Sequence, residues 1–183
     1  MTDRSRPRFS HVGCYTFDPE KMADFYCQTF GLVITDRGVG TTGHNVIFMS
    51  GDPHEHHQFV VANGREHGSK PLSNQISFRV QDVAALKAFA VYFEENSIPL
   101  VQCKTHGNAL SIYIQDPEGN TIEVYCHTPW HIQQPVGIPL DLTKSDAEIL
   151  VQSEELCRLH PSFKTRDDWS RDVALRLKKR IGA

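Results

Sequence analysis

Two short segments of alternating hydrophobic and polar residues, 110–115 and 121–126, lie on either side of a turn sequence. The turn, 116–120, reads Asp-Pro-Glu-Gly-Asn, in which proline presets φ and glycine accepts a positive φ. This pattern predicts a β-hairpin. In the second strand, Glu123 lies between two apolar residues, so alternation places it on the face opposite to both. Because a charge in mid-strand requires a partner, a metal ion or water, Glu123 is either a functional residue or part of a solvated face.

Strands and amphipathic helices alternate along the rest of the chain. Asp18 followed by proline predicts a helix N-terminus, and Gly31 predicts the end of that helix. Asp82 is predicted to cap a second helix, and a capping box at 145–148 begins a third helix that runs to about Leu159. The remaining predicted elements are strands at 9–17, 32–36, 46–50, 58–62, 75–80 and 98–103 and a last helix capped by residues 165–168.

An internal repeat is visible when the chain is aligned with itself. A shift of 64 residues aligns Asp18 with Asp82, together with the strand before each of them. A shift of 65 residues places Gln58 against Glu123. The chain therefore contains two predicted β-α-β-β-β units, each with one polar residue in its first strand and one in its last. These four residues are His11, Gln58, Gln75 and Glu123, and packing about a pseudo-twofold axis would bring them together.

The repeat predicts an α+β fold in which two βαβββ modules form a cupped mixed sheet. Residues 1–8 are expected to be an N-terminal tail, 9–73 the first module and 74–127 the second. Residues 128–183 are expected to be a C-terminal arm and two helices, and the proline-rich arm carries no strand pattern. This extension is expected to cover an open sheet edge, to cap the site or to make a homo-oligomer contact.

Composition narrows the classes of function. The 183 residues are 39% hydrophobic and 22% charged, which is ordinary for a globular protein. A net charge of −3 gives no reason to expect nucleic acid or an anionic membrane as a partner. No apolar run approaches the roughly 18 residues of a membrane span, and the polar start carries no secretory signal. The five cysteines include no C-x-x-C pair, so we expect reduced thiols in a cytoplasmic protein.

Several short motifs resemble the vicinal oxygen chelate superfamily, which includes glyoxalase I, bleomycin and fosfomycin resistance proteins and type I extradiol ring-cleaving dioxygenases. The matching segments are Ser-His-Val-Gly at 10–13, Asp-Phe-Tyr at 24–26, Phe-Gly-Leu at 30–32, Gln-Ile-Ser-Phe-Arg-Val at 75–80 and Asp-Pro-Glu-Gly-Asn-Thr-Ile-Glu at 116–123. The last block is fairly specific to the superfamily, although it does not identify the reaction. The resemblance covers residues 9–126 and implies the two-module fold.

A second set of residues resembles the small extradiol dioxygenases that act on biphenyl-2,3-diol and catechol. By this resemblance His57, the second residue of a His-His pair, is the acid–base residue. The resemblance also implies that His106 and Tyr113 hydrogen-bond the substrate oxygens. It implies an Fe(II) site, or alternatively a Mn(II) site or a site for another divalent metal, with the ligands His11, Gln75 and Glu123.

Gln75 departs from the dioxygenase pattern, which has histidine at this position. An amide oxygen is a weaker donor than imidazole for such metals. Gln75 is therefore interpreted as a true oxygen ligand, as a residue beside the ligands or as the mark of a lost metal site, and His57 is a candidate replacement ligand. Gln58 argues against glyoxalase I activity, which uses a carboxylate there as its fourth ligand and base.

The expected function is Fe(II)-dependent ring cleavage of a catecholic aromatic, with a small aromatic substrate and dioxygen as partners. One alternative is another enzyme of the superfamily, an isomerase, lyase or thiol transferase that uses Mn, Ni or Zn. The other is a metal-free module of the bleomycin-resistance kind that sequesters a ligand. The remaining histidines carry no motif and are interpreted as structural or loop residues: His44, His54, His56, His67, His127, His131 and His160.

Overall fold

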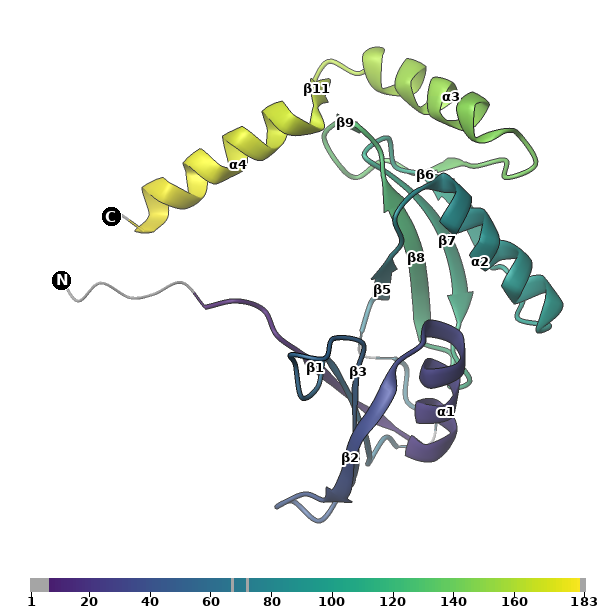
Figure 1. Ribbon diagram of the computed structural model, residues 1–183, viewed down its shortest axis with the longest axis vertical. Helices are drawn as coiled ribbons and strands as arrows, with labels where there is room; N and C mark the ends of the chain where they lie inside the picture. Colours follow the sequence, from purple (N-terminus) through teal and green to yellow (C-terminus); the bar gives the residue numbers. More distant parts are fainter. Residues whose placement is uncertain (1–6, 67, 72, 182–183) are drawn as a thin grey trace. The chain divides into compact units, whose positions relative to one another are not determined.

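The computed structural model describes residues 7–66, 68–71 and 73–181, and most of the predicted N-terminal tail and His67 lie outside these ranges. The described chain divides into two compact units (Figure 1). The N-terminal unit comprises residues 7–74 and the turn 115–121. The C-terminal unit comprises residues 75–114 and 122 onward. The predicted α+β class is confirmed, since each unit contains a mixed sheet and helices in the order β-α-β-β-β.

The N-terminal unit is built from one helix and four strands: β1 (Val12–Thr16), α1 (Pro19–Phe30), β2 (Val33–Val39), β3 (Asn45–Ser50) and β4 (Phe59–Asn63). The sheet order is β1-β4-β3-β2, with β1 and β4 parallel and the other pairs antiparallel. Both ends of α1 form as predicted. The Asp18 side chain accepts a hydrogen bond from the backbone of Lys21, and Gly31 ends the helix with a φ of 68°.

The turn between the last two strands is anchored in the N-terminal unit. A carboxylate oxygen of Glu118 accepts hydrogen bonds from the backbone N–H groups of Phe17 and Asp18, at 2.7 and 2.9 Å. The Arg65 guanidinium lies 3.3 Å from the other carboxylate oxygen of Glu118, and the side chains of this ion pair are only 9% and 5% exposed. The buried Tyr26 hydroxyl donates to Asp116 at 3.0 Å. Side chains of the turn therefore hold the junction of β1 and α1.

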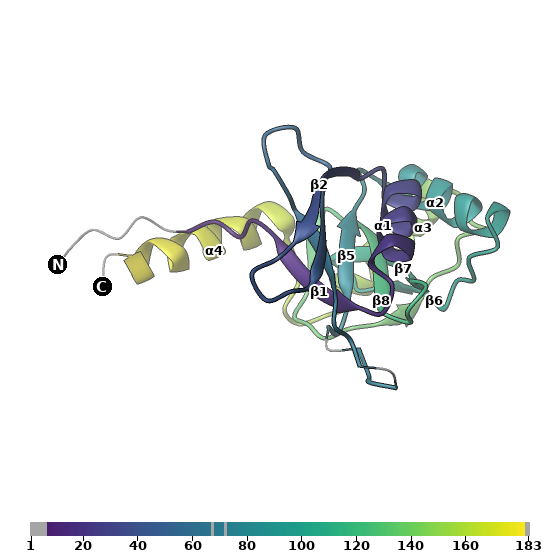
Figure 2. The same cartoon turned by 90° about the horizontal axis from the view of Figure 1, so that it is seen from below.

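The C-terminal unit begins with β5 (Ile76–Arg79), α2 (Val83–Glu95), β6 (Gln102–Thr105), β7 (Ala109–Gln115) and β8 (Thr121–His127). The extension that follows contains β9 (Trp130–His131), β10 (Ile138–Pro139), α3 (Asp146–Arg158), β11 (Lys164–Thr165) and α4 (Arg166–Ile181). The sheet order is β10-β6-β7-β8-β5, with β5 and β8 parallel. In Figure 2, α4 projects away from the strands of its own unit, and none of its described side chains is buried.

Three sequence predictions about these elements are corrected. The second strand extends to Val39 instead of ending at residue 36. The strand predicted at 98–103 forms at Gln102–Thr105, because the Ile98 N–H still bonds to the carbonyl of Phe93 at the end of α2. The C-terminal arm, predicted to contain no strand, contributes two short ones: β9 pairs with β11, and β10 pairs with β6.

The register of the strands corrects the internal repeat. In the N-terminal unit Gly13 pairs with Val60, and in the C-terminal unit Ser77 pairs with Glu123. Val60, rather than Gln58, is therefore the counterpart of Glu123. The Gln58 side chain instead stabilises the loop between β3 and β4, because its oxygen accepts a hydrogen bond from the N–H of Gly51 at 3.0 Å.

Two further expectations concern membrane-spanning segments and the state of the cysteines. Among the described residues, no helix has the length and apolar character needed to cross a membrane. All five cysteines are free thiols, and burial raises the pKa of the Cys126 thiol to about 11.

Candidate active site

The two faces of β8 differ as the hairpin pattern predicts. Ile122, Val124 and Cys126 are fully buried on one face. Glu123 points to the other face, where its side chain is 10% exposed. The carboxylate is therefore largely removed from water and must be stabilised by its neighbours.

Three side chains donate hydrogen bonds to the Glu123 carboxylate. The Tyr113 hydroxyl on β7 donates to Oε1 at 2.7 Å. The Ser77 hydroxyl on β5 and the amide nitrogen of Gln75 both donate to Oε2, each at 2.7 Å. Two of the proposed ligands, Gln75 and Glu123, therefore lie in direct contact. Ser77 was not singled out in the sequence, although its pairing with Glu123 across a parallel ladder explains its place.

His106 extends this cluster through Tyr113. Its Nε2 lies 2.9 Å from the Tyr113 hydroxyl, and its Nδ1 lies against the backbone carbonyl of Val136. A carbonyl only accepts, so Nδ1 carries a proton. Tyr113 therefore links the His106 imidazole to the Glu123 carboxylate through two contacts. Burial, followed by the contact with Glu123, raises the pKa of the Tyr113 phenol well above its usual range.

A tight turn holds His106 in place. Gly107 has a φ of +77°, and a Cβ built on it would lie 2.6 Å from Ile132 and 2.9 Å from the sulfur of Cys157. The Gly107 N–H donates to the Thr105 hydroxyl at 3.1 Å, and the Gly107 carbonyl accepts from Thr128 at 2.5 Å. Backbone conformation and lack of space therefore both require glycine here.

We expect Gly107→Ala to lower the free energy of unfolding by about 2–4 kcal/mol, because strain at positive φ adds to overpacking of a buried contact. Gly119→Ala is the matched control. Gly119 has a φ of +80°, but its Cβ would meet no atom within 4 Å, so only the backbone strain applies. Urea unfolding of both variants measures the difference, and equal losses of stability would contradict this account of Gly107.

A second cluster of polar side chains lies in the N-terminal unit. The rings of His11 and His57 are 4.2 Å apart between centroids. Nδ1 of His57 lies 2.8 Å from Nδ1 of His56, whose Nε2 lies 2.9 Å from Asp36. Burial is the main cause that lowers the pKa of His57, and the neighbouring imidazoles of His11 and His56 lower it further. His56 lies in a loop, as predicted, and there it contacts His57 and has Asp36 as its own partner.

The structure thus brings the predicted site residues together in two sets. Gln75, His106, Tyr113 and Glu123 form one hydrogen-bonded cluster in the C-terminal unit. His11 and His57 form the other in the N-terminal unit. The assignment of all six residues to one catalytic site remains a prediction.

The chemistry of the donor set fits a divalent metal ion. An imidazole, an amide oxygen and a carboxylate suit a transition metal, and among the described residues Glu123 forms no ion pair with a lysine or arginine. The buried Ser111 hydroxyl, two residues before Tyr113 on β7, has no hydrogen-bond partner in the described part of the chain. Among the described residues, no group of three or more His, Cys, Asp and Glu side chains is arranged to hold a metal. The proposed ligand set contains two such side chains, His11 and Glu123, together with the amide of Gln75.

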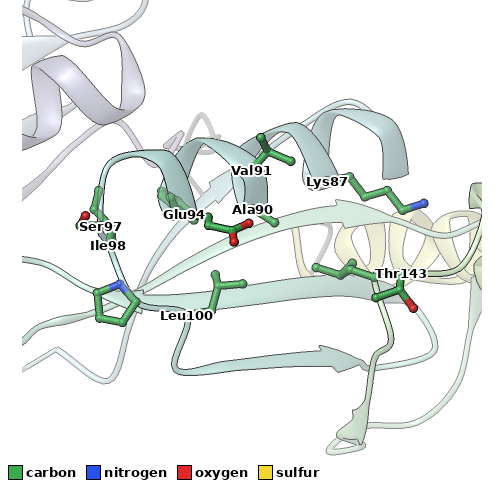
Figure 3. A pocket seen from close by; sticks show the side chains of 11 residues that line it. Lys87, Ala90, Val91, Glu94, Ser97, Ile98, Leu100 and Thr143 are labelled. Carbon is green, nitrogen blue, oxygen red and sulfur yellow. The ribbon is translucent and has the colours of Figure 1, made fainter.

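A large pocket lies elsewhere in the C-terminal unit. It has a volume of about 720 Å³ and lies between α2, the segment 97–100 and residues 142–143. Figure 3 shows that Val91, Ile98 and Leu100 contribute apolar side chains to it. Its lining includes no histidine, tyrosine or cysteine, so it offers no chemistry that resembles the cluster around Glu123.

Comparison with known proteins identifies the family. Residues 8–124 match the Glyoxalase/Bleomycin resistance protein/Dioxygenase superfamily. Because this match covers more than half of the chain, the protein belongs to that superfamily, and the predicted resemblance is confirmed.

Individual relatives span several activities. The chain is 26% identical to biphenyl-2,3-diol 1,2-dioxygenase 2 of Rhodococcus globerulus, over 74% of this chain and 77% of that protein. A glyoxylase/bleomycin resistance protein/dioxygenase domain from Frankia sp. EAN1pec has a similar structure, with a TM-score of 0.56 at 16% identity, covering 67% of this chain and 93% of the other. A Mn(II)-bound fosfomycin resistance protein from Listeria monocytogenes gives 0.53 at 14% identity, covering 66% and 93%. These structures support the fold alone.

Proposed function

We propose that the protein is a metal-dependent dioxygenase that opens the ring of a catecholic aromatic. The observation that carries the proposal is the hydrogen-bonded chain from His106 through Tyr113 to Glu123. This chain gives the carboxylate proposed as a metal ligand two neighbouring side chains that can hydrogen-bond a substrate oxygen. The similarity to a biphenyl-2,3-diol dioxygenase supports the same reaction class.

The proposed ligands are His11, Gln75 and Glu123, with Fe(II) as the metal. When bound, the metal would supply open coordination positions and the redox chemistry that a reaction with dioxygen requires. The residues of the chain would handle the protons. His57 would accept a proton from a substrate hydroxyl and later return it. Tyr113 and His106 would donate hydrogen bonds to a substrate oxygen as negative charge develops on it.

We expect Tyr113→Phe to lower kcat roughly a hundredfold, because it removes the hydroxyl that joins His106 to Glu123. Metal content should not change, since all three proposed ligands remain. Tyr15→Phe is a suitable control, because Tyr15 is 55% exposed and lies in the other unit. Steady-state oxygen uptake by both variants tests the prediction, and an unchanged kcat in Tyr113→Phe would remove this residue from the mechanism.

One observation favours a second candidate, a metal-free module that sequesters a ligand. The three donors around Glu123 already satisfy its carboxylate without any metal. Elemental analysis of protein purified without oxygen separates the candidates. Iron at roughly one ion per chain supports the dioxygenase. Mn, Ni or Zn in its place favours an isomerase, lyase or transferase, and no metal even after reconstitution favours the binding module.

A further inference from the structure

Positive charge gathers on the same face of the C-terminal sheet as Glu123. Tyr125 and His127 follow Glu123 along β8 in steps of two residues, about 6.8 Å each, and therefore share its face. Arg79 on β5 pairs in register with Tyr125, just as Ser77 pairs with Glu123. A guanidinium nitrogen of Arg79 lies 3.4 Å from Nε2 of His127.

The C-terminal extension adds a second arginine to this group. β11 pairs with β9, and the N–H of Arg166 donates to the carbonyl of Pro129 at 2.8 Å. This backbone contact holds the start of α4 just beyond the end of β8. The half-buried Arg166 guanidinium lies 5.9 Å from the ring of Trp169, which stacks on His131 at 4.9 Å. We call Arg79, His127 and Arg166 the arginine patch.

The arginine patch lacks a negative partner. In the described part of the chain, neither Arg79 nor Arg166 forms an ion pair with a carboxylate. Four other arginines form such pairs, namely Arg37, Arg65, Arg158 and Arg171, whereas Arg8 and Arg176 form none among the described residues. Burial is the main cause that lowers the pKa of Arg166, and the nearby charge of Arg79 is the next. Burial and the same two arginines lower the pKa of His127.

The uncompensated guanidinium of Arg166 is half-buried, and such a charge is costly unless an anion joins it, whereas Arg79 is exposed. Arginine presents paired N–H donors that match the two oxygens of a carboxylate, and the bonds are charge-assisted. Arg79 and His127 lie on the face that carries Tyr113 and Glu123, and Tyr125 lies between Glu123 and His127 along β8.

We propose that the arginine patch binds a carboxylate group of the substrate, so that the substrate is an aromatic diol bearing a carboxylate side chain. This inference rests on the proposed function, because it takes the face around Glu123 as the place where the diol binds. It also gives the C-terminal extension a role, since Arg166 and Trp169 both come from α4.

Titration calorimetry under anaerobic conditions tests the proposal on the full-length protein as purified. The ligands are 3,4-dihydroxybenzoate and its neutral analogue 3,4-dihydroxybenzamide, which share the diol and differ in charge. We expect the benzoate to bind roughly tenfold to a hundredfold more tightly, as loss of a charge-assisted hydrogen bond would predict. Arg166→Gln and Arg79→Gln should each reduce this preference by about tenfold.

Arg171→Gln is the matched control on the same helix, because Arg171 is exposed and paired with Asp168. It should keep the full preference for the benzoate. Circular dichroism shows whether each variant is folded, and the two arginines on different elements give independent variants. Equal affinity for the two ligands, or a preference that survives in both folded variants, would overturn the proposal. Because no turnover is involved, a failed ring-cleavage assay would count against the proposed function and not against the patch.

Discussion

Glu123→Gln should abolish both the binding of a divalent metal and oxygen uptake. Glutamine keeps the shape of the side chain, but it removes the only carboxylate among the proposed ligands. The remaining donors, His11 and Gln75, are neutral, and two neutral donors without an anionic oxygen hold Fe(II) weakly. The fold should persist, since the amide oxygen of glutamine can still accept from Tyr113, while the Ser77 hydroxyl can accept from the amide nitrogen instead of donating.

Metal analysis after anaerobic reconstitution measures this effect directly. Glu95→Gln is the matched control, because Glu95 is exposed at the end of α2 and contributes to neither cluster. The control should retain metal and turnover at the level of the unaltered protein. If Glu123→Gln retained stoichiometric iron, Glu123 would not be a ligand and the proposed metal site would be wrong.

Glu118→Ala should cause the largest loss of stability, about 3–5 kcal/mol, because it breaks a buried ion pair from one side. The change leaves Arg65 without its carboxylate at a position only 9% exposed. It also removes the acceptor for the N–H groups of Phe17 and Asp18, where β1 meets α1.

Glu20→Ala is the control for this prediction within the same unit. It removes the pair between Glu20 and Arg37, whose side chains are 64% and 53% exposed. Exposed pairs of this kind contribute about 0–1 kcal/mol. Urea denaturation of the two variants compares the losses, and similar values would mean that burial of the Glu118 pair has no structural importance.

Local signals in the sequence predict the helix ends well. Asp18, Asp82 and Ser145 each accept a hydrogen bond from the backbone three residues later, as their capping patterns predict. The sequence also predicts which residues of β8 are buried, because side chains of a strand alternate between its two faces. These features depend on residues that are neighbours along the chain, so the sequence contains all that determines them.

Contacts between segments that are distant along the chain could not be predicted from the sequence. Glu118 is predicted only as a turn residue, yet its partner Arg65 lies more than fifty residues away. His56, in the loop after β3, meets Asp36 on β2, and the pairing of β11 with β9 brings the start of α4 to the end of β8, where the charge of Arg79 acts on Arg166. The sequence pattern aligns Gln58 with Glu123, whereas strand register shows that Val60 is the counterpart of Glu123.

Oxygen uptake tests the proposed reaction most directly. Ring cleavage inserts both atoms of dioxygen into the diol, so it consumes the two in equal amounts and needs no other oxidant or reductant. Iron-loaded protein is mixed with a panel of catechols in an oxygen electrode, and binding of each catechol is measured separately without oxygen. We predict uptake equal to the diol consumed, with a ring-opened product. A catechol that binds to the iron-loaded protein while none in the panel causes oxygen uptake would contradict the proposal.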